Sequence, residues 1–334
     1  MKIPQGAPSA RILALGEYTP ARVVMNDEII DKIDSSDQWI RDRSGIVSRR
    51  VAAPDETVAD MATHAGSKAV AAAGIPPADI DMVIVATCTH PYQTPGASTE
   101  VADRIGAGAP GAMDVSAACA GFCYGLSLAA DAIRAGNSRY ALVIGAEKLT
   151  EFTDPYDRST AFIFGDGAGG VVVGPSEEPG IGPVAWGSDG SHVRTITQHP
   201  TYSELRADMA QGAELRFPTL RMEGQTVFRW AVTQMAPVVN RALELAGVQP
   251  HELGAFVPHQ ANMRITDALV KALQLPESVP VARDIAHRGN TSAASIPLAL
   301  HGMVERGEVD SGKPALFIGF GAGLTYAAQV ARIP

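Results

Sequence analysis

Short runs of hydrophobic residues alternate with longer amphipathic or alanine-rich segments along the chain. The run over residues 81–87 (DMVIVAT) is short and mostly apolar, which is typical of a strand buried on both faces of a sheet. Thr57 and Asp60 form a capping-box pattern that begins an alanine-rich helix, and Gly74 ends it. Strands that alternate with helices in this way predict a mixed, mainly parallel α/β fold built in layers.

The same pattern gives bounds for the other elements. Strands are expected over residues 10–15, 111–116, 140–145, 255–258 and 315–319. Helices are expected over residues 57–73, 119–135, 224–246 and 291–306, with a further helix start at 27–30 that Asn26 would cap. Residues 175–222 are rich in Gly, Pro and polar residues, so we interpret them as a connection or cap whose structure the pattern does not define.

The second half of the sequence repeats the first at an offset of 174 residues. ALVIG at 141–145 corresponds to ALFIG at 315–319, and the 27-residue segments that start at Cys119 and at Ala293 align without a gap. Two similar halves that pack about a pseudo-twofold axis would bring equivalent helix starts together. The repeat therefore predicts three segments, namely an N-terminal half over 1–174, the connection over 175–222 and a C-terminal half over 223–334.

Composition narrows the classes of function. The chain has 334 residues, of which 46% are hydrophobic and 19% charged, as in a globular protein with two core units. A net charge of −9 argues against a general nucleic-acid binder, which needs a basic surface. Three cysteines in so long a chain indicate a reducing compartment such as the cytoplasm. We see neither an apolar stretch of the roughly 18 residues that a membrane span needs nor a signal peptide at the N-terminus.

Two common site motifs are disfavoured. The sequence has neither H-E-x-x-H nor paired C-x-x-C, so no metal site is expected. Residues 165–170 (GDGAGG) match G-x-G-x-x-G, but in a dinucleotide-binding fold a helix must follow that motif. Residues 171–173 (VVV) predict a strand instead. We therefore interpret the glycines as tight backbone packing, which argues against a NAD-dependent oxidoreductase.

Cys119 is the first candidate catalytic residue. It lies between a predicted strand and a predicted helix, in SAACAG at 116–121, where small neighbours let the backbone turn sharply. Free amides and the dipole at a helix start favour the thiolate, which attacks a carbonyl or a thioester. A buried core cysteine is the alternative, and position alone leaves both open. Cys123 and Cys88 are interpreted as core residues.

His259 and Asn290 are the other candidates. His259 follows the predicted strand 255–258, and the carboxyl ends of strands carry ligand groups in α/β folds. Its alternative is a hydrogen-bonded structural histidine. Asn290 precedes a predicted helix, where asparagine is also simply a good cap. If the two halves pack symmetrically, a Cys, a His and an Asn could meet at one point.

Four motifs together resemble a known family. They are DVSAACAGF at 114–122, PHQANMRI at 258–265, GNTSAASIP at 289–297 and GFGAGLTY at 319–326. In this order, and spanning nearly the whole chain, they resemble β-ketoacyl-acyl-carrier-protein synthase III, the thiolase-fold condensing enzyme often called FabH. The resemblance implies a thiolase-like layered αβαβα fold with pseudo-twofold symmetry. It also implies that Cys119, His259 and Asn290 form a catalytic triad.

The resemblance implies a mechanism as well. Cys119 would take an acyl group from acyl-CoA, and malonyl-acyl-carrier protein would then be decarboxylated to a carbanion that attacks the acyl-cysteine. His259 and Asn290 would donate hydrogen bonds to the enolate-like oxygen. The backbone amides of Cys119 and Ala322 would hold the tetrahedral oxyanion, although the family often has Gly at the position of Ala322. The implied product is a 3-ketoacyl-acyl-carrier protein that initiates fatty acid biosynthesis, and no cofactor is implied.

Further positions match family sites for binding. CoA would contact Trp39, Arg43 and Arg158, and the acidic carrier protein would be attracted by Arg229, Arg264 and Lys271. Thr94 matches the end of the acyl pocket, near the partner subunit of a homodimer, where some members carry Phe. The smaller side chain predicts that branched starters such as isobutyryl-CoA are accepted besides acetyl-CoA. The plainer alternatives are a packing aromatic for Trp39, a loop ion pair for Arg158 and a solvated face for the basic residues.

Neighbouring enzyme classes differ at identifiable residues. Thiolases carry a second reactive cysteine in the C-terminal glycine loop, which here reads GFGAG at 319–323. Elongating ketosynthases use a second histidine where this chain has Asn290. The nearest rival is a starter-unit ketosynthase or acyltransferase of a polyketide pathway with the same triad. A binding-only relative is the last alternative, and the intact triad argues against it.

Overall fold

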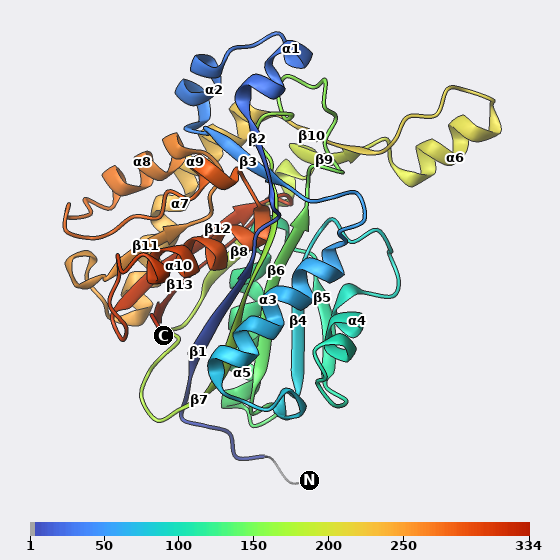
Figure 1. The fold of residues 1–334 in the computed structure, drawn as a ribbon. Coiled ribbons are helices and arrows are strands. Elements are labelled where there is room, and N and C mark those ends of the chain that lie inside the picture. The colour runs from blue at the N-terminus through green and yellow to red at the C-terminus, as the bar shows by residue number, and fades with distance from the viewer. Residues whose placement is uncertain (1–3) are drawn as a thin grey trace.

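The computed structural model describes residues 4–334; the first three residues of the predicted N-terminal half lie outside the described part. Two β-sheets form the body of the molecule (Figure 1). The first sheet has the strand order β1 (Ser9–Tyr18), β7 (Asp166–Ser176), β6 (Ala141–Lys148), β4 (Met82–Ala86) and β5 (Gly111–Val115). The second sheet has the order β11 (Ala255–Pro258), β12 (Pro314–Gly321), β13 (Thr325–Arg332) and β8 (Ala185–Ser188).

The two sheets confirm the internal repeat. The order β4-β6-β7-β1 recurs as β11-β12-β13-β8, with one parallel pair followed by two antiparallel pairs in each. The registers also correspond, because Met82 faces Ala141 in the first sheet and Ala255 faces Ala315 in the second. Equivalent residues of β4 and β11 are therefore 173 apart, whereas those of β6 and β12 are 174 apart.

Helices cover the sheets in the five layers that the resemblance implied. Between the sheets lie α5 (Gly121–Arg134) and α10 (Ser295–Glu305), whose Leu126 and Leu300 share one buried cluster with Val143 of the first sheet and Phe317 of the second. The outer face of the first sheet is covered by α3 (Val58–Ala73) and α4 (Ala97–Arg104), as Figure 1 shows for α3. The outer face of the second is covered by α7 (Gly224–Ala246) and α8 (Met263–Ala272). Within residues 4–334, every helix is too short or too polar to cross a membrane.

Most predicted elements are present, and several bounds change. The capping box of α3 is formed, with the Thr57 hydroxyl accepting from the Asp60 amide and the Asp60 carboxylate accepting from the Thr57 amide; Gly74 ends the helix at φ +65°. The predicted helices 119–135 and 291–306 each start with a separate 3₁₀ turn, over Ala118–Ala120 and Ser292–Ala294.

The prediction that Asn26 caps a helix is wrong. The 3₁₀ turn Asn26–Glu28 follows Met25 and leads to the short helix α1 (Ile30–Ile33). Asn26 is buried, and its amide donates to the Asp37 carboxylate and to the Ile46 carbonyl, while its oxygen accepts from Arg49. A buried arginine needs hydrogen-bond acceptors, so the Asn26 side chain pairs with Arg49 in the core and does not cap a helix.

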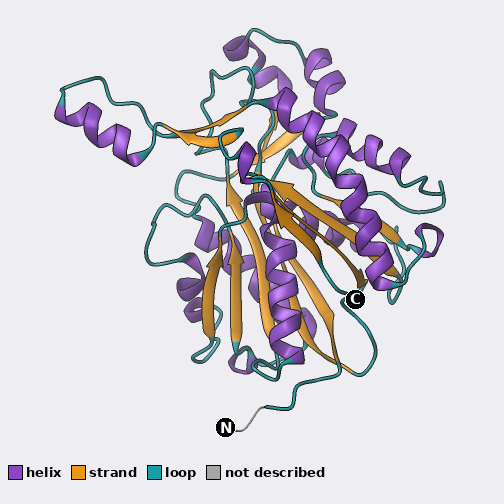
Figure 2. Cartoon of the chain, turned by 180° about the vertical axis from the view of Figure 1, so that it is seen from behind, coloured by secondary structure: helices purple, strands orange, loops and turns teal. Residues whose placement is uncertain are grey.

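The segment 175–222 contains ordered structure that the sequence pattern did not define. It supplies β8 to the second sheet and then forms the hairpin β9 (Ile196–His199) and β10 (Thr219–Met222). Between these strands the chain carries α6 (Tyr202–Ala210) on an arm that extends from the body in both views (Figures 1 and 2). The remaining elements lie near the top of Figure 1, and they are β2 (Arg22–Met25), β3 (Ser48–Val51), α2 (Asp37–Ser44) and α9 (Ile285–Arg288).

The two halves meet most closely at the turns that precede α5 and α10. Gly145 of the first half lies against the Ala293 carbonyl of the second, and Gly319 of the second half lies against Cys119 and Ala120 of the first. Gly319 is the repeat equivalent of Gly145, so the contact is reciprocal. Ala118 and Ser292, also equivalent, adopt left-handed φ values of +46° and +48°. Residues with a Cβ avoid this conformation unless the surroundings enforce it, as they do at both turns.

This contact generates a prediction. Gly145→Ala would place a methyl group inside the van der Waals distance of the Ala293 backbone, which cannot move without shifting the turn. We expect a loss of about 3 kcal/mol in the free energy of unfolding, measured by denaturant titration. Gly108→Ala is the matched control, because its nearest neighbour would be 3.8 Å away and its stability should change little. Equal stability of the two variants would contradict the close contact.

Candidate functional site

One cavity of about 1010 Å³ collects the three candidate catalytic residues. Cys119 comes from the turn before α5, His259 from the end of β11, and Asn290 from the loop before α10. Both halves thus contribute to one site, as the pseudo-twofold packing of the helix starts predicted. Phe320, Gly321 and Ala322 complete the wall beside them.

Cys119 lies in a tightly packed turn. A Cβ on Gly321 would be 2.9 Å from the Cβ of Cys119 and 3.1 Å from its Sγ, so only glycine fits at this position of β12. The residue is partly open to the cavity, yet protein atoms surround the thiol. Burial raises the pKa of Cys119 to about 12, the Ser292 hydroxyl opposes that rise, and the charge of Glu147 adds to it. Burial thus acts against the helix start, which favours the thiolate, and it is the larger of the two effects on Cys119.

His259 is held rigidly and is uncharged. Its side chain is buried, its Nδ1 lies 2.8 Å from the Ser295 hydroxyl, and its ring meets the Phe320 ring edge to face at 5.3 Å. Burial lowers the pKa of His259 to about 3, so the imidazole is neutral at physiological pH. A neutral imidazole donates a hydrogen bond from one nitrogen only, and the other nitrogen accepts.

Asn290 has its amide orientation fixed by its own loop. The side-chain oxygen accepts from the Ser292 amide at 2.8 Å, as in an Asx turn, so the side-chain NH₂ is the end that remains for the cavity. The backbone of Asn290 donates to the Ile163 carbonyl and accepts from the Gly165 amide. Asn290 is therefore both a structural turn residue and a donor positioned in the cavity wall.

The glycine-rich run 165–170 packs against backbone, as interpreted from the sequence. A Cβ on Gly165 would collide with the Arg288 carbonyl, and one on Gly169 would lie 2.8 Å from the Leu298 amide nitrogen. Both glycines lie where the first half meets the chain around Asn290 and α10. From Asp166 on, this run is itself part of β7, which continues to Ser176, so no dinucleotide-binding helix follows it.

Ala322 lies in the loop between β12 and β13 and lines the cavity. The Thr325 hydroxyl lies 3.1 Å from the Ala117 carbonyl and 3.0 Å from the Ala322 carbonyl. This hydroxyl ties the loop of the second half to the turn that carries Cys119. The backbone around Ala322 is thereby held next to the thiol.

An aromatic and cationic stack lies at the cavity. The guanidinium of Arg158 lies 5.1 Å from the centre of the Trp39 ring, and that of Arg43 lies 5.7 Å from it. Trp39 also contacts Phe162, with the two rings edge to face and their centres 5.3 Å apart. Trp39 and Arg43 line the cavity, whereas Arg158 is exposed next to the lining residue Ser159. The three predicted CoA contacts are thus brought together.

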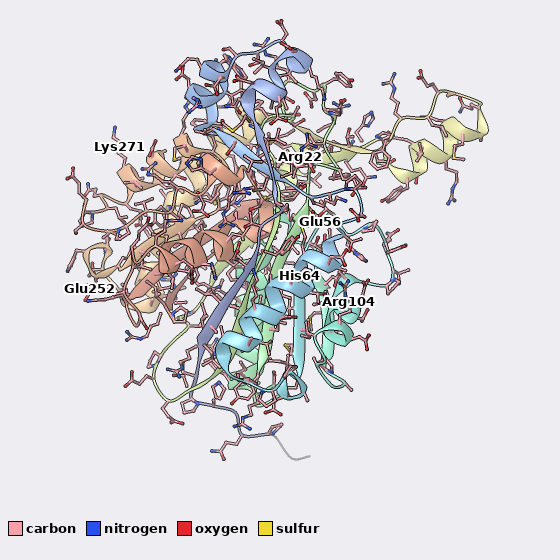
Figure 3. The ribbon with its side chains drawn as sticks, in the orientation of Figure 1. Arg22, Glu56, His64, Arg104, Glu252 and Lys271 are labelled. Atoms are coloured by element: carbon pink, nitrogen blue, oxygen red, sulfur yellow. The ribbon has the colours of Figure 1, made fainter. Side chains whose placement is uncertain are left out.

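The other predicted binding residues are only partly gathered. Arg229 of α7 and Arg264 of α8 line the cavity, and Arg264 lies over the Phe228 ring at 5.0 Å. Lys271 is exposed further along α8, outside the cavity lining, where Figure 3 shows it at the surface. Thr94 is exposed in the loop between β4 and α4, and it does not line the cavity of the described chain.

Cys88 lines the cavity and the buried Glu147 is hydrogen-bonded to it, although the sequence analysis placed neither residue there. The interpretation of Cys88 as a core residue is wrong, since it is exposed and lines the cavity, whereas Cys123 is fully buried as expected. The buried Glu147 carboxylate accepts from the Thr89 hydroxyl and from the amide and thiol of Cys88, and burial raises its pKa. One sequence signal existed: the charged residues Glu147 and Lys148 directly follow the apolar run 141–146.

Comparisons with known proteins agree with this geometry. The family models of 3-oxoacyl-[acyl-carrier-protein] synthase III and of its C-terminal part match residues 113–190 and 243–333. The chain is 53% identical to the beta-ketoacyl-[acyl-carrier-protein] synthase III 1 of Streptomyces coelicolor, with 100% of this chain and 99% of that protein covered. It is 55% identical to the beta-ketoacyl-[acyl-carrier-protein] synthase III of Streptomyces glaucescens, with the same coverage.

Solved structures are similar over the whole chain. The priming β-ketosynthase of the R1128 polyketide biosynthetic pathway superposes with a TM-score of 0.96 at 48% identity, covering 100% of this chain and 98% of that one. The 3-oxoacyl-(acyl carrier protein) synthase III from Pseudomonas aeruginosa superposes with a TM-score of 0.88 at 39% identity, covering 98% of each chain. Since relatives at this identity extend over the full length, the chain belongs to the 3-oxoacyl-[acyl-carrier-protein] synthase III family of acyl-transferring condensing enzymes, in the thiolase superfamily.

Proposed function

We propose that this chain condenses a short-chain acyl-CoA with malonyl-acyl-carrier protein, releasing CO₂ and CoA and forming a 3-ketoacyl-acyl-carrier protein that initiates fatty acid biosynthesis. The observation that carries the proposal is the meeting of Cys119, His259 and Asn290 in one cavity from both halves of the chain. A thiol beside two neutral hydrogen-bond donors suits acyl transfer followed by stabilisation of an enolate. The proposed reaction uses no cofactor.

In the first step the Cys119 sulfur attacks the thioester carbonyl of acyl-CoA. A carbon–sulfur bond to Cys119 forms, the bond to the CoA sulfur breaks, and the thiol proton leaves with CoA. Burial raises the pKa of Cys119, so the thiol holds its proton at neutral pH, and we propose that this proton leaves during the attack. The amides of Cys119 and Ala322 are proposed to hold the oxyanion, next to the tight contact of Gly321 with Cys119.

In the second step the malonyl carbon–carbon bond breaks and CO₂ leaves. The electron pair moves onto the malonyl thioester oxygen, toward which His259 and the Asn290 amide are proposed to donate. His259 is neutral, so it stabilises the enolate by donating a hydrogen bond and need not transfer a proton. The carbanion then attacks the acyl-Cys119 carbonyl, the bond between that carbonyl carbon and the Cys119 sulfur breaks, and the thiolate takes up a proton from solvent. Each donor of this kind typically contributes a few kcal/mol.

The cavity residues support the proposed substrates. Trp39 offers a flat ring whose face already holds the cation of Arg158, so an adenine could insert between them or replace the guanidinium. Arg229 and Arg264 place positive charge at the cavity of a protein whose net charge is −9, and local charge of this kind steers an acidic carrier protein. Lys271 would extend that patch along α8.

We further propose a homodimer located in the cytoplasm. Among the described strands, β5 pairs only with β4, so it forms a sheet edge that another chain could cover, and Met113 on it is exposed. Figures 1 and 2 place the arm with α6 on the same side of the molecule as this edge. A second copy there would also cover the Thr94 loop, which is how Thr94 could influence the acyl pocket and admit branched starters. Three free cysteines in the described chain suit a reducing compartment.

Priming of a polyketide pathway is the second candidate function. Its support is the similarity to the priming β-ketosynthase of the R1128 pathway. The higher identity to proteins named as synthase III favours the fatty acid role. Both roles share the acyl-cysteine step and differ in the starter and in the acceptor carrier protein.

The acyl-cysteine step is tested by intact-protein mass. Wild type incubated with acetyl-CoA or isobutyryl-CoA should gain the mass of one acyl group, and Cys119→Ala should gain none. Cys123→Ala is the control, because that buried thiol should not be acylated and its removal should leave the gain intact. An unchanged gain in Cys119→Ala, or no gain in wild type with either donor, would overturn the proposed first step.

The protonation state of Cys119 predicts a pH dependence. A raised pKa means that the thiolate fraction keeps increasing with pH throughout the usual working range. The rate of iodoacetamide alkylation at Cys119, corrected with Cys119→Ala, should therefore rise about tenfold per pH unit between about pH 6 and about pH 9. A plateau below about pH 7 would instead indicate a lowered pKa and would contradict this result.

The aromatic stack predicts a binding defect. Trp39→Ala removes the ring that contacts Arg158, so the KM for acetyl-CoA should rise about 5- to 30-fold while kcat changes little. Tyr156→Ala is a matched control because Tyr156 is an exposed aromatic residue in the same loop as Arg158. An equal effect of both substitutions on KM would argue against a specific role for Trp39.

A further inference from the structure

The imidazole of His259 must present one particular nitrogen to the cavity. Its Nδ1 lies 2.8 Å from the Ser295 hydroxyl, and both residues are buried, so Nε2 is the nitrogen left to face the substrate. In the proposed reaction this nitrogen has to carry the proton, because it donates to the enolate oxygen. A neutral histidine whose proton sat on Nδ1 would present a lone pair to a developing negative charge.

The hydrogen bonds around Ser295 decide where that proton sits. The Ser295 oxygen already accepts a hydrogen bond from the backbone amide of Gln260 at 3.3 Å. Within residues 4–334, the one acceptor in reach of the Ser295 hydroxyl proton is His259 Nδ1. If Nδ1 instead donated to Ser295, this buried hydroxyl would keep a proton without a partner, which is unfavourable. The arrangement with every group satisfied has Ser295 donating to Nδ1 and the histidine proton on Nε2.

The first half of the chain has the same two positions but lacks the hydrogen bond between Ser295 and His259. Ser295 is the repeat equivalent of Gly121, and His259 is the equivalent of Ala86. A Cβ on Gly121 would lie 2.9 Å from the Cβ of Ala86, so the same two positions are neighbours there too. In the first half this contact is made by the two smallest residues, Gly121 and Ala86. In the second half it is made by the Ser295 hydroxyl and the His259 imidazole.

We infer that Ser295 is a positioning residue that sets the tautomer and orientation of His259, so that the imidazole presents Nε2–H to the malonyl thioester. Its catalytic meaning rests on the proposed function, but the tautomer itself does not. Ser295 is buried and is not among the residues that line the cavity. It acts through His259 alone, as the hydrogen-bond partners of catalytic and metal-binding histidines do in general.

The tautomer is measured directly by ¹⁵N NMR of protein labelled at histidine, with His259 assigned by its loss in His259→Gln. Wild type should show a protonated Nε2 and an unprotonated Nδ1 at neutral pH. Ser295→Ala should alter the Nδ1 signal by removing its donor. A protonated Nδ1 in wild type would overturn the inference, whatever the activity of the enzyme.

Kinetics test the consequence for catalysis in separate half-reactions. Ser295→Ala should slow the release of labelled CO₂ from malonyl-acyl-carrier protein by about tenfold or more, and should change acylation of Cys119 by acetyl-CoA far less. Ser295→Thr keeps the hydroxyl and should recover much of the rate. Ser127→Ala, which alters a buried serine of α5, controls for simple loss of stability.

Two kinetic outcomes would count against the inference. If Ser295→Ala decarboxylated malonyl-acyl-carrier protein at the wild-type rate, the hydroxyl would be dispensable. Equal losses in both half-reactions, with a fall in Tm matching that of Ser127→Ala, would show a structural role only. A wild-type protein that neither acylates nor decarboxylates would refute the proposed function, and the NMR result would still decide the tautomer.

Discussion

The reciprocal contact of two backbone turns is the constraint on which the site depends. Gly145 admits the Ala293 turn against β6, and Gly319 admits the Cys119 turn against β12. Any side chain at either glycine would separate the two helix starts. Their separation would move Cys119 away from the loop that carries Asn290. Cys119 and Asn290 are therefore close together because the backbones of the two halves pack tightly across the pseudo-twofold axis. This backbone packing sets the positions of their side chains.

The duplicated frame is symmetric, but the chemistry placed on it is not. Cys119 corresponds to Ala293, Ala86 to His259, and Gly121 to Ser295. The first half supplies the nucleophile and otherwise small residues, and the second half supplies the polar donors. Gly321 of the second half corresponds to the buried Glu147 of the first. The glycine leaves room for the Cys119 side chain, whereas the glutamate fixes the loop with Cys88 that forms another wall of the cavity.

Burial keeps the reacting groups neutral before substrate arrives. It raises the pKa of Cys119 to about 12 and lowers the pKa of His259 to about 3, so a thiolate–imidazolium pair is unfavourable. A neutral histidine suits a donor to an enolate. A neutral thiol suits a nucleophile that loses its proton only as it attacks. In such a site the direction of each hydrogen bond, set by groups such as Ser295 and the Ser292 amide, matters more than net charge.

The sequence by itself determined the alternation of strands and helices, the internal repeat and the bounds of α7 and β11, because each rests on local periodicity or on residue identity at a fixed offset. Its motifs, through their resemblance to a family, also singled out the three residues that meet in the cavity. Only the tertiary structure decided the rest. A strand was expected at residues 171–173, but the bounds of β7, β8 and β13 were not predicted. β7 pairs with β1, and β8 pairs with β13, so partners far away in the sequence complete these strands. The roles of Asn26 and Cys88 and the neutral state of Cys119 depend on burial and on partners from distant segments, which no local pattern contains.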